Sequence, residues 1–182
     1  MLRTHIEAGT ELGKAADLIR AGALAPDELV NEMVKARLAE PDCAGGFILD
    51  GYPRTRQQAE KLSAWLEQRG AGELVIHLVV DYNVIIARLS GRRHCPKCGA
   101  LYNLVSRPPS LDGRCDSDGQ RLVIREDDSE PVIRRRLEAY ERQTQPLIEY
   151  FRQHCKPVLG IETGDRSPAE LLQTIHNAIE IG

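Results

Sequence analysis

The sequence predicts an α/β fold in which helices cover both faces of a parallel sheet. Three short apolar runs, at residues 46–50, 73–81 and 157–163, are bounded by turn residues, which is typical of buried strands. Helical patterns lie between and after these runs, and this alternation indicates a parallel sheet. The 182 residues have room for one ordinary core with inserted subdomains.

The amino-terminal region is expected to be helical. Residues 10–21 form a helical pattern that ends at Gly22, a residue type that commonly follows a helix. Pro26 and the two acids after it open a second helix, because proline suits the first turn and acidic side chains complement the helix dipole. Residues 1–26 should therefore form a small helical flap.

Four further helices are predicted, and two of them carry local signals. Ser167 and Glu170 have the spacing of a capping box around a proline, so the last helix should begin there. Pro146 should kink the helix that contains it, because proline has no backbone N–H to donate. The predicted ranges are 55–69, 83–90, 131–154 and 167–179.

Two short knuckles in the middle of the chain have the spacing of a structural zinc site. Cys95 and Cys98 form a CxxC pair, and Cys115 and Asp118 form a CxxD pair after a gap of sixteen residues. Thiolates and a carboxylate can together surround zinc tetrahedrally, with no open position for chemistry. The alternative is two loose cysteine pairs or a disulfide. We expect the metal to hold a loop together.

Arginines flank the knuckles on both sides. Guanidinium groups fork onto phosphate oxygens and stay charged at any working pH, so converging arginines suit a polyphosphate substrate. A solvated helix face with ion pairs would also explain the run at residues 134–136. The arginines are Arg88, Arg92, Arg93, Arg125, Arg134, Arg135 and Arg136.

The motifs occur in the order that is typical of one protein family. An apolar run ends at Asp50 and continues as Gly-Tyr-Pro-Arg, with Gln58 shortly after, and the two knuckles and the arginines follow. In this order and spacing the chain resembles adenylate kinase, in the bacterial long form whose lid carries a structural zinc. Further matching pieces are residues 1–3, 11–13, 27–30, 91–93, 127–128 and 134–137.

The chain departs from the family at its start. A member of the family should begin with an apolar strand that runs into a glycine-rich P-loop ending in Gly-Lys, which cradles the donor phosphates. The chain has no such motif, and Met1 coincides with a methionine that is internal in the family. The first strand, the P-loop and the first helix are thus expected to be missing, and we expect a truncated or mis-started reading frame.

The resemblance implies an AMP site on the flap side. Arg3 and Arg54 match arginines that grip the AMP phosphate, and Gln58 matches the amide that reads adenine. A solvent-facing glutamine is the alternative for Gln58. Asp50 matches the acid that holds water on Mg²⁺, with a helix or turn cap as its alternative. The remaining matched AMP positions are Ala23, Leu24, Ala25 and Gly51, the alanines and leucine acting through their backbone.

The resemblance also implies a donor site and a catalytic set. Phosphoryl transfer needs no protein nucleophile, because positioning and electrostatic stabilisation supply the catalysis. The matched arginines that close over the transferring group are Arg88, Arg92, Arg125 and Arg136, the last two also touching AMP. Leu101 and Tyr102 would border the ATP base and ribose, and Arg166 lies where the family contacts adenine through a carbonyl.

The implied reaction is ATP plus AMP giving two ADP, with Mg²⁺ bound to ATP and Zn²⁺ in the lid. The expected domains are the AMP-binding flap at 1–26, the core at 27–90 and 131–182, and the zinc lid at 91–130. The alternatives are a kinase for another nucleoside monophosphate, or a noncatalytic zinc module that binds nucleotide or nucleic acid. Without its P-loop, the chain is expected to be an impaired enzyme.

Composition argues against several other classes. The net charge of −3 gives no global basic signature, so a nucleic-acid partner is not expected. The longest apolar stretch, at residues 74–80, is too short to span a membrane, and no signal peptide is seen, so a cytoplasmic enzyme is expected, monomeric at full length. Cys43 and Cys155 are expected to pack, and the five histidines are assigned no catalytic role.

Overall fold

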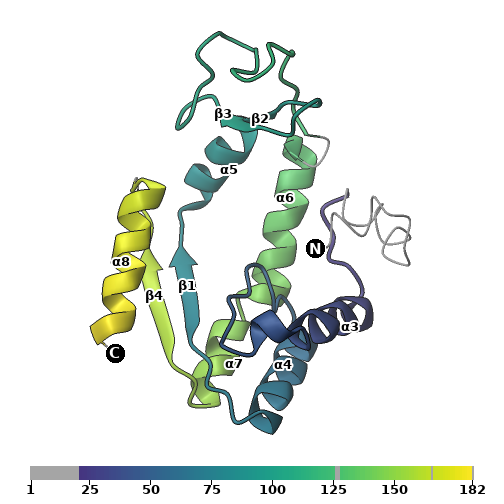
Figure 1. The fold of residues 1–182 in the computed structure, drawn as a ribbon, viewed down its shortest axis with the longest axis vertical. Coiled ribbons are helices and arrows are strands. Elements are labelled where there is room, and N and C mark those ends of the chain that lie inside the picture. The colour runs from purple at the N-terminus through teal and green to yellow at the C-terminus, as the bar shows by residue number, and fades with distance from the viewer. Residues whose placement is uncertain (1–20, 126–127, 165, 182) are drawn as a thin grey trace.

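The computed structural model describes residues 21–125, 128–164 and 166–181. Arg3 and all but the last residue of the helix predicted at 10–21 lie outside these ranges. Within them the chain forms a parallel two-stranded sheet with helices around it, and a separate small hairpin at one end (Figure 1). The α/β class and the parallel sheet are therefore confirmed. Among the described helices, none is long and apolar enough to cross a membrane.

The sheet pairs β1 (Val75–Val79) with β4 (Val158–Glu162) in parallel. The register runs from Val75 opposite Val158 to Val79 opposite Glu162. Both strands were predicted, and each is shorter than its apolar run. On one face, Val75 and Val158 pack against a buried cluster that includes Ala59 and Phe151 from two helices.

The strand predicted at residues 46–50 does not form. These residues are irregular backbone, and the Ile48 side chain is 95% exposed. A parallel strand needs a neighbour for its backbone hydrogen bonds, and in the described part of the chain no strand pairs with this segment. Its flanking apolar residues Phe47 and Leu49 instead pack against the cluster between α3 and α4.

The prediction of a covered sheet is also wrong for one strand. Ile76 and Leu78 of β1 are 37% and 41% exposed. Successive side chains on a strand point to opposite faces, so these two residues mark an uncovered face. Ile161 of β4 is buried, and α8 (Pro168–Ile181) contacts that strand. Helices thus lie on both faces of the sheet, but the covering of β1 is incomplete.

The helix boundaries follow the local signals closely. The chain enters α3 (Asp27–Leu38) at Pro26, and Thr55 caps α4 (Arg56–Gln68) by accepting a hydrogen bond from the Gln58 N–H. The predicted capping box starts α8: the Ser167 N–H donates to Glu170 Oε2 at 2.7 Å, and the Glu170 N–H donates to Ser167 Oγ at 3.3 Å. The remaining elements of this part are the 3₁₀ turn η2 (Pro41–Cys43) and α5 (Tyr82–Ser90).

The helix predicted at residues 131–154 is interrupted before its proline. It divides into α6 (Glu130–Ala139), the π turn η4 (Tyr140–Thr144) and α7 (Leu147–Gln153). The Gln145 N–H donates to the Tyr140 carbonyl at 2.8 Å, a wider ring than the α-helical one. Pro146 cannot donate at all, so the break falls where the regular ladder would lose a bond.

The hairpin at the far end pairs β2 (Arg92–His94) with β3 (Leu101–Asn103) in antiparallel fashion. It lies beyond the ends of α5 and α6 and carries the loops of the two knuckles (Figure 1). Asn103 fastens it to α5, because its Nδ2 donates to the Arg88 carbonyl at 2.8 Å. Residues 91–125 of the predicted lid form this small β unit.

Candidate functional site

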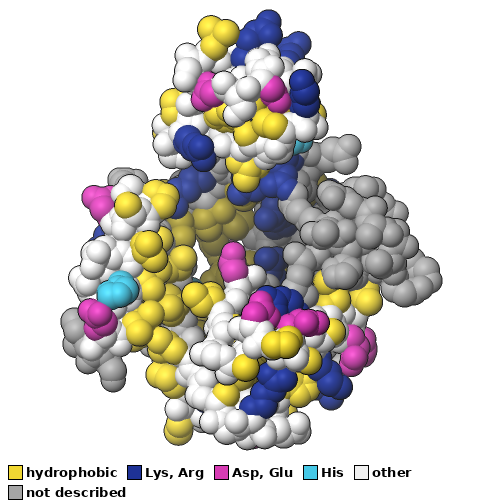
Figure 2. All heavy atoms as spheres, in the orientation of Figure 1, with side chains coloured by type: hydrophobic (Ala, Val, Ile, Leu, Met, Phe, Trp, Pro, Cys, Tyr) yellow, Lys and Arg dark blue, Asp and Glu magenta, His cyan; other side chains and the backbone are white. Residues whose placement is uncertain are grey.

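A hollow separates the hairpin from the body of the molecule. Figure 2 shows it open to the viewer, with Lys and Arg side chains gathered along its upper edge. Three described elements reach this region: β2 of the hairpin, α6, and the loop that precedes α4. Each of them carries an arginine that the sequence assigned to phosphate binding.

One buried carboxylate brings two of these arginines together. Asp128 Oδ1 lies 3.4 Å from Arg92 Nη1 and 3.6 Å from Arg136 Nη1. The Asp128 side chain is completely buried, whereas both guanidinium groups remain about one-third exposed. Arg125 is close by along the chain, since its carbonyl accepts from the Asp128 N–H at 3.0 Å. The arrangement brings positive groups from β2 and α6 together on one carboxylate.

Arg54 joins the same positive region from the loop before α4. Burial against neighbouring atoms lowers the pKa of its partly exposed side chain, and the charge of Arg136 lowers it further, while Asp50 raises it. Its Nε donates to the Gly51 carbonyl at 2.7 Å. Gly51 has φ +72°, a backbone conformation that favours glycine, and a Cβ there would lie 2.6 Å from Arg54 Nη2 and would displace this guanidinium.

The end of the flap reaches α6 at the same point. Gly22 has φ +87°, and a Cβ there would lie 2.9 Å from the Val132 carbonyl and 3.1 Å from Arg136 Cγ. Only glycine combines this backbone conformation with so close an approach. After it, Ala23 is exposed, Leu24 is half-buried and Ala25 is buried in the cluster of α3. The three predicted backbone contacts thus follow directly after the glycine that approaches α6.

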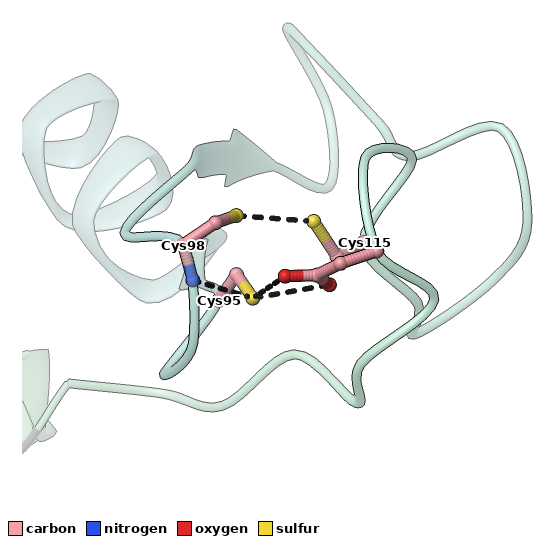
Figure 3. Close-up of side chains that lie close together, drawn as sticks. Cys95, Cys98 and Cys115 are labelled. Carbon is pink, nitrogen blue, oxygen red and sulfur yellow. Dashed lines mark hydrogen bonds between the residues drawn. The ribbon is translucent and has the colours of Figure 1, made fainter.

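The knuckles bring their four predicted ligands into one cluster. The ligand atoms of Cys95, Cys98, Cys115 and Asp118 all lie within 4.8 Å of one another. Figure 3 shows the three thiols turned toward a common centre, with Cys98 Sγ 3.5 Å from Cys115 Sγ. A tetrahedron of about 2.3 Å zinc–sulfur bonds has edges of about 3.8 Å, so the spacing suits a metal ion. All five cysteines are free in this structure, so the cluster holds three thiols and one carboxylate and no disulfide.

The two knuckles are built alike. In each, a glycine four residues after the first cysteine donates its N–H to that cysteine's carbonyl: Gly99 to Cys95 at 3.0 Å and Gly119 to Cys115 at 2.8 Å. Both glycines have positive φ, 75° and 69°, which lets the backbone turn back. The repeat in the sequence therefore includes this glycine as well as the ligands.

The protonation of the cluster favours a cation. The Tyr102 hydroxyl lowers the pKa of the Cys115 thiol, and the backbone N–H of Gln120 lowers that of Asp118. Although its backbone hydrogen bond to Ala100 acts in the other direction, the pKa of Cys98 rises to about 11, because Cys115, burial, Cys95 and Asp118 all raise it. The Cys98 thiol thus gains most from a neighbouring cation, because metal binding requires its thiolate form.

Tyr102 lies against the cluster of predicted metal ligands, where the sequence did not place it. The side chain is 6% exposed; its hydroxyl lies 3.5 Å from Cys115 Sγ and accepts from the Asp116 N–H at 2.8 Å. The neighbouring Leu101 is 50% exposed on the outside of the hairpin. The sequence signal for a contact with the cysteines is the position of this aromatic residue, four residues after Cys98.

Gln58 is also buried, and each end of its side-chain amide makes one hydrogen bond within the protein. It is 3% exposed; its Nε2 donates to Asp27 Oδ1 at 2.7 Å and its Oε1 accepts from the Arg54 N–H at 2.8 Å. The solvent-facing alternative is therefore wrong. Asp27, which the sequence did not single out beyond its helix start, is thirty-one residues away and comes to Gln58 only through the packing of α3 on α4.

The remaining predicted residues lie on three other segments of the chain. Asp50 is exposed in the irregular segment before Gly51. Arg88 Nη2 donates weakly to the Gly164 carbonyl at 3.4 Å, and Arg166 Nη1 donates to the Glu162 carbonyl at 2.9 Å. Both last contacts fall at the carboxyl end of β4, the edge at which α/β sheets usually bind their ligands. Cys43 is buried as expected, whereas Cys155 is exposed and does not pack.

Comparisons with known proteins settle the family. The family model for adenylate kinase matches residues 1–156. The chain belongs to the adenylate kinase family. It is 48% identical over 182 residues to the adenylate kinase of Pseudothermotoga lettingae, a match that covers 99% of this chain and 83% of the relative.

Two other adenylate kinases show how far the likeness extends. That of Moorella thermoacetica is 46% identical over 155 residues, covering 84% of this chain and 71% of the relative. That of Caldicellulosiruptor bescii is 43% identical over 183 residues, covering 100% of this chain and 84% of the relative. The resemblance drawn from the motifs is confirmed, and membership of the adenylate kinase family identifies the chain as a phosphotransferase.

Proposed function

We propose that this chain binds ATP and AMP across the hollow and transfers a phosphoryl group between them to give two ADP. The observation that carries the proposal is the meeting of arginines from separate elements: Arg92 of β2 and Arg136 of α6 on Asp128, with Arg54 close enough to Arg136 for their charges to interact. Convergent guanidinium groups can surround the equatorial oxygens of a transferring phosphoryl group.

We assign the two nucleotides to the two sides of this cluster. On the AMP side lie Arg54, Gly51, Gln58, the flap residues 23–25 and, by resemblance, Arg3. On the ATP side lie Arg88, Arg92, Arg166 and the hairpin residues Leu101 and Tyr102. Because Tyr102 is buried on the metal cluster, its contribution to ATP would come from the backbone or ring edge. Arg125 and Arg136 would serve both nucleotides.

We assign zinc to the cluster formed by Cys95, Cys98, Cys115 and Asp118. The donor set and its spacing support this choice, since three thiolates and one carboxylate are typical zinc ligands. The ion would stabilise the hairpin as a lid and would do no chemistry. Mg²⁺ would enter with ATP, and Asp50 is the acid that we propose to hold its water ligands.

We further propose that the 182 residues alone turn over slowly. They contain no P-loop, whose lysine and backbone amides would hold the donor phosphates. The chain should therefore still bind AMP, while its binding of ATP should be weak or absent. A coupled assay of ADP formation should give a low rate that rises steeply when a family P-loop segment precedes the chain. A rate close to that of the extended chain would contradict this part.

Binding measurements with matched arginine variants test the assignment. AMP binding by calorimetry should weaken about tenfold or more in Arg54→Ala and Arg136→Ala, because each removes a charged contact to phosphate. Arg56→Ala and Arg134→Ala are the controls. Arg134 lies two residues before Arg136 on α6, and Arg56 lies two residues after Arg54 at the start of α4. Their exposed side chains pair with Glu130 and Glu60. Equal effects in all four variants, or no AMP binding by the unaltered chain, would overturn the AMP site.

A further inference from the structure

The Gln58 side chain is held at both ends by groups of fixed hydrogen-bonding type. The Arg54 backbone N–H can only donate, and it bonds Oε1 at 2.8 Å. A carboxylate can only accept, and Asp27 Oδ1 bonds Nε2 at 2.7 Å. Turning the amide over would set the NH₂ group against an N–H and the oxygen against a carboxylate. The orientation of this buried amide is therefore decided by its partners.

Asp27 is itself fixed in place. Its second oxygen, Oδ2, accepts from the Thr55 hydroxyl at 2.8 Å. Thr55 caps α4, and Asp27 begins α3, so the carboxylate joins the starts of two helices. The carboxylate thus has little freedom to move away from Gln58.

We propose that Asp27 is a positioning residue which locks the Gln58 amide in one orientation and thereby selects a 6-amino purine over a 6-oxo purine in the monophosphate site. The inference rests on the proposed function, in which Gln58 reads the base of AMP. It adds a residue that never touches the nucleotide, together with the reason for the choice of base.

A fixed amide orientation favours one arrangement of donor and acceptor on the base. Beyond its two protein bonds, the amide keeps one N–H and one oxygen lone pair. Adenine offers an acceptor at N1 and a donor at its 6-amino group, which match that N–H and that lone pair. Hypoxanthine offers a donor at N1 and an acceptor at O6, the reverse pattern. A freely turning amide would serve both bases, whereas a locked amide serves only the first.

The unaltered chain gives the first test through three ligands of nearly equal size. Calorimetry should rank AMP tightest, purine riboside 5′-monophosphate about tenfold weaker, and inosine 5′-monophosphate about tenfold weaker again. The second ligand loses one hydrogen bond, and the third also presents a donor to a donor. If the inosine nucleotide binds as tightly as the purine riboside nucleotide, the amide turns freely and the lock is wrong.

A variant pair gives the second test. In Asp27→Asn the side chain can offer either its oxygen or its NH₂ to Gln58, so only the Arg54 N–H still opposes turning of the amide. The ratio of the inosine to the adenosine dissociation constant should therefore fall about fivefold, a part of the full discrimination. Tyr52→Phe is the control. It removes the 2.7 Å bond from the Tyr52 hydroxyl to Asn31 of α3 and the 3.4 Å contact to the Gln58 backbone carbonyl, but leaves both bonds of the Gln58 side-chain amide in place. That variant should keep the ratio within about twofold of the original.

Different outcomes would contradict the positioning role of Asp27 and the proposed AMP site. An unchanged ratio in Asp27→Asn, or an equal fall in Tyr52→Phe, would show that Asp27 only holds the helices together. Loss of AMP binding in the unaltered chain, or AMP binding that ignores Arg54→Ala, would overturn the monophosphate site itself. If Asp27→Asn does not fold, the ranking of the three ligands on the unaltered chain still decides the matter.

Discussion

The hairpin unit at residues 91–125, the proposed lid, and the parallel sheet differ in how completely their side chains are buried. The lid has a very small core, the cluster of Cys95, Tyr102, Cys115 and Leu122, yet these side chains are at most 7% exposed. The sheet has longer apolar strands, but Ile76 and Leu78 remain well exposed. A few residues can order a small unit when an ion joins them, whereas strands depend on neighbours to cover both faces.

Loss of the proposed zinc should have the largest effect on this contrast. Structural zinc contributes about 10–16 kcal/mol of binding free energy in small metal-dependent domains. Cys115→Ser should therefore lose the metal and unfold the lid while α4 stays protected, as measured by metal analysis and amide hydrogen exchange. Cys155→Ser, at an exposed cysteine, is the control. A full equivalent of zinc in purified Cys115→Ser would contradict the ligand assignment.

The two faces of the sheet should differ in what they contribute. Phe151 is 3% exposed in the cluster against Val75 and Val158, so Phe151→Ala should lower the free energy of unfolding by about 3–5 kcal/mol. Ile76→Ala, on the uncovered face, should cost less than about 1 kcal/mol. Urea unfolding measures both. Equal losses would mean that the exposed face of β1 is covered in solution.

The tyrosine of the lid should affect metal affinity more than fold. Tyr102→Phe keeps the buried ring but removes the hydroxyl that contacts Cys115 Sγ and the Asp116 N–H. Loss of such an outer contact typically weakens metal binding about 10–100-fold. Competition with a coloured chelator gives the affinity, and Tyr82→Phe, at an exposed tyrosine outside the lid, is the control. Identical affinities for the two variants would leave Tyr102 a packing residue.

The smallest effect should come from the capping box of α8 and depends on pH. Hydrogen bonds from Ser167 hold the pKa of the Glu170 carboxyl below its usual value of 4.5. The stabilisation is thus present above about pH 4.5 and is lost as the pH falls through the lower folded pKa. Ser167→Ala should cost about 1 kcal/mol at neutral pH through the lost cap. In thermal melts, the difference between variant and original should shrink on acidification, and a constant difference would argue against the box.

The sequence predicted those elements whose signals are local. Pro26, Thr55 and the Ser167 box placed helix starts to within about a residue, because a cap acts on its own first turn. The ligand cluster was also predicted, since both knuckles are short and repeat one pattern. The strand at 46–50 was predicted wrongly because an apolar run becomes a strand only when another strand lies beside it.

The contacts that the sequence did not reveal join residues far apart in the chain. Asp128 meets Arg92 across thirty-six positions, and Asp27 meets Gln58 across thirty-one. No spacing rule connects such pairs, because the packing of helices and of the hairpin sets their distance. Tyr102 lies only four residues after Cys98, and this proximity could have indicated a contact with the ligand cluster. The resemblance assigned it to ATP instead.

The π turn at Tyr140–Thr144 changes the direction in which the side chains of α7 point relative to those of α6. In one continuous α-helix, the two segments would present a single common face. Each residue advances an α-helix by about 100°, so a turn that holds an extra residue shifts every side chain after it. Arg136 on α6 can thereby face the hollow while Tyr150 and Phe151 on α7 pack on Ala59 beside the sheet. The Thr144 hydroxyl within this turn donates to the Arg54 carbonyl at 2.9 Å. Deleting one residue here would keep the composition and nearly the length, yet would swing the aromatic pair out of the core.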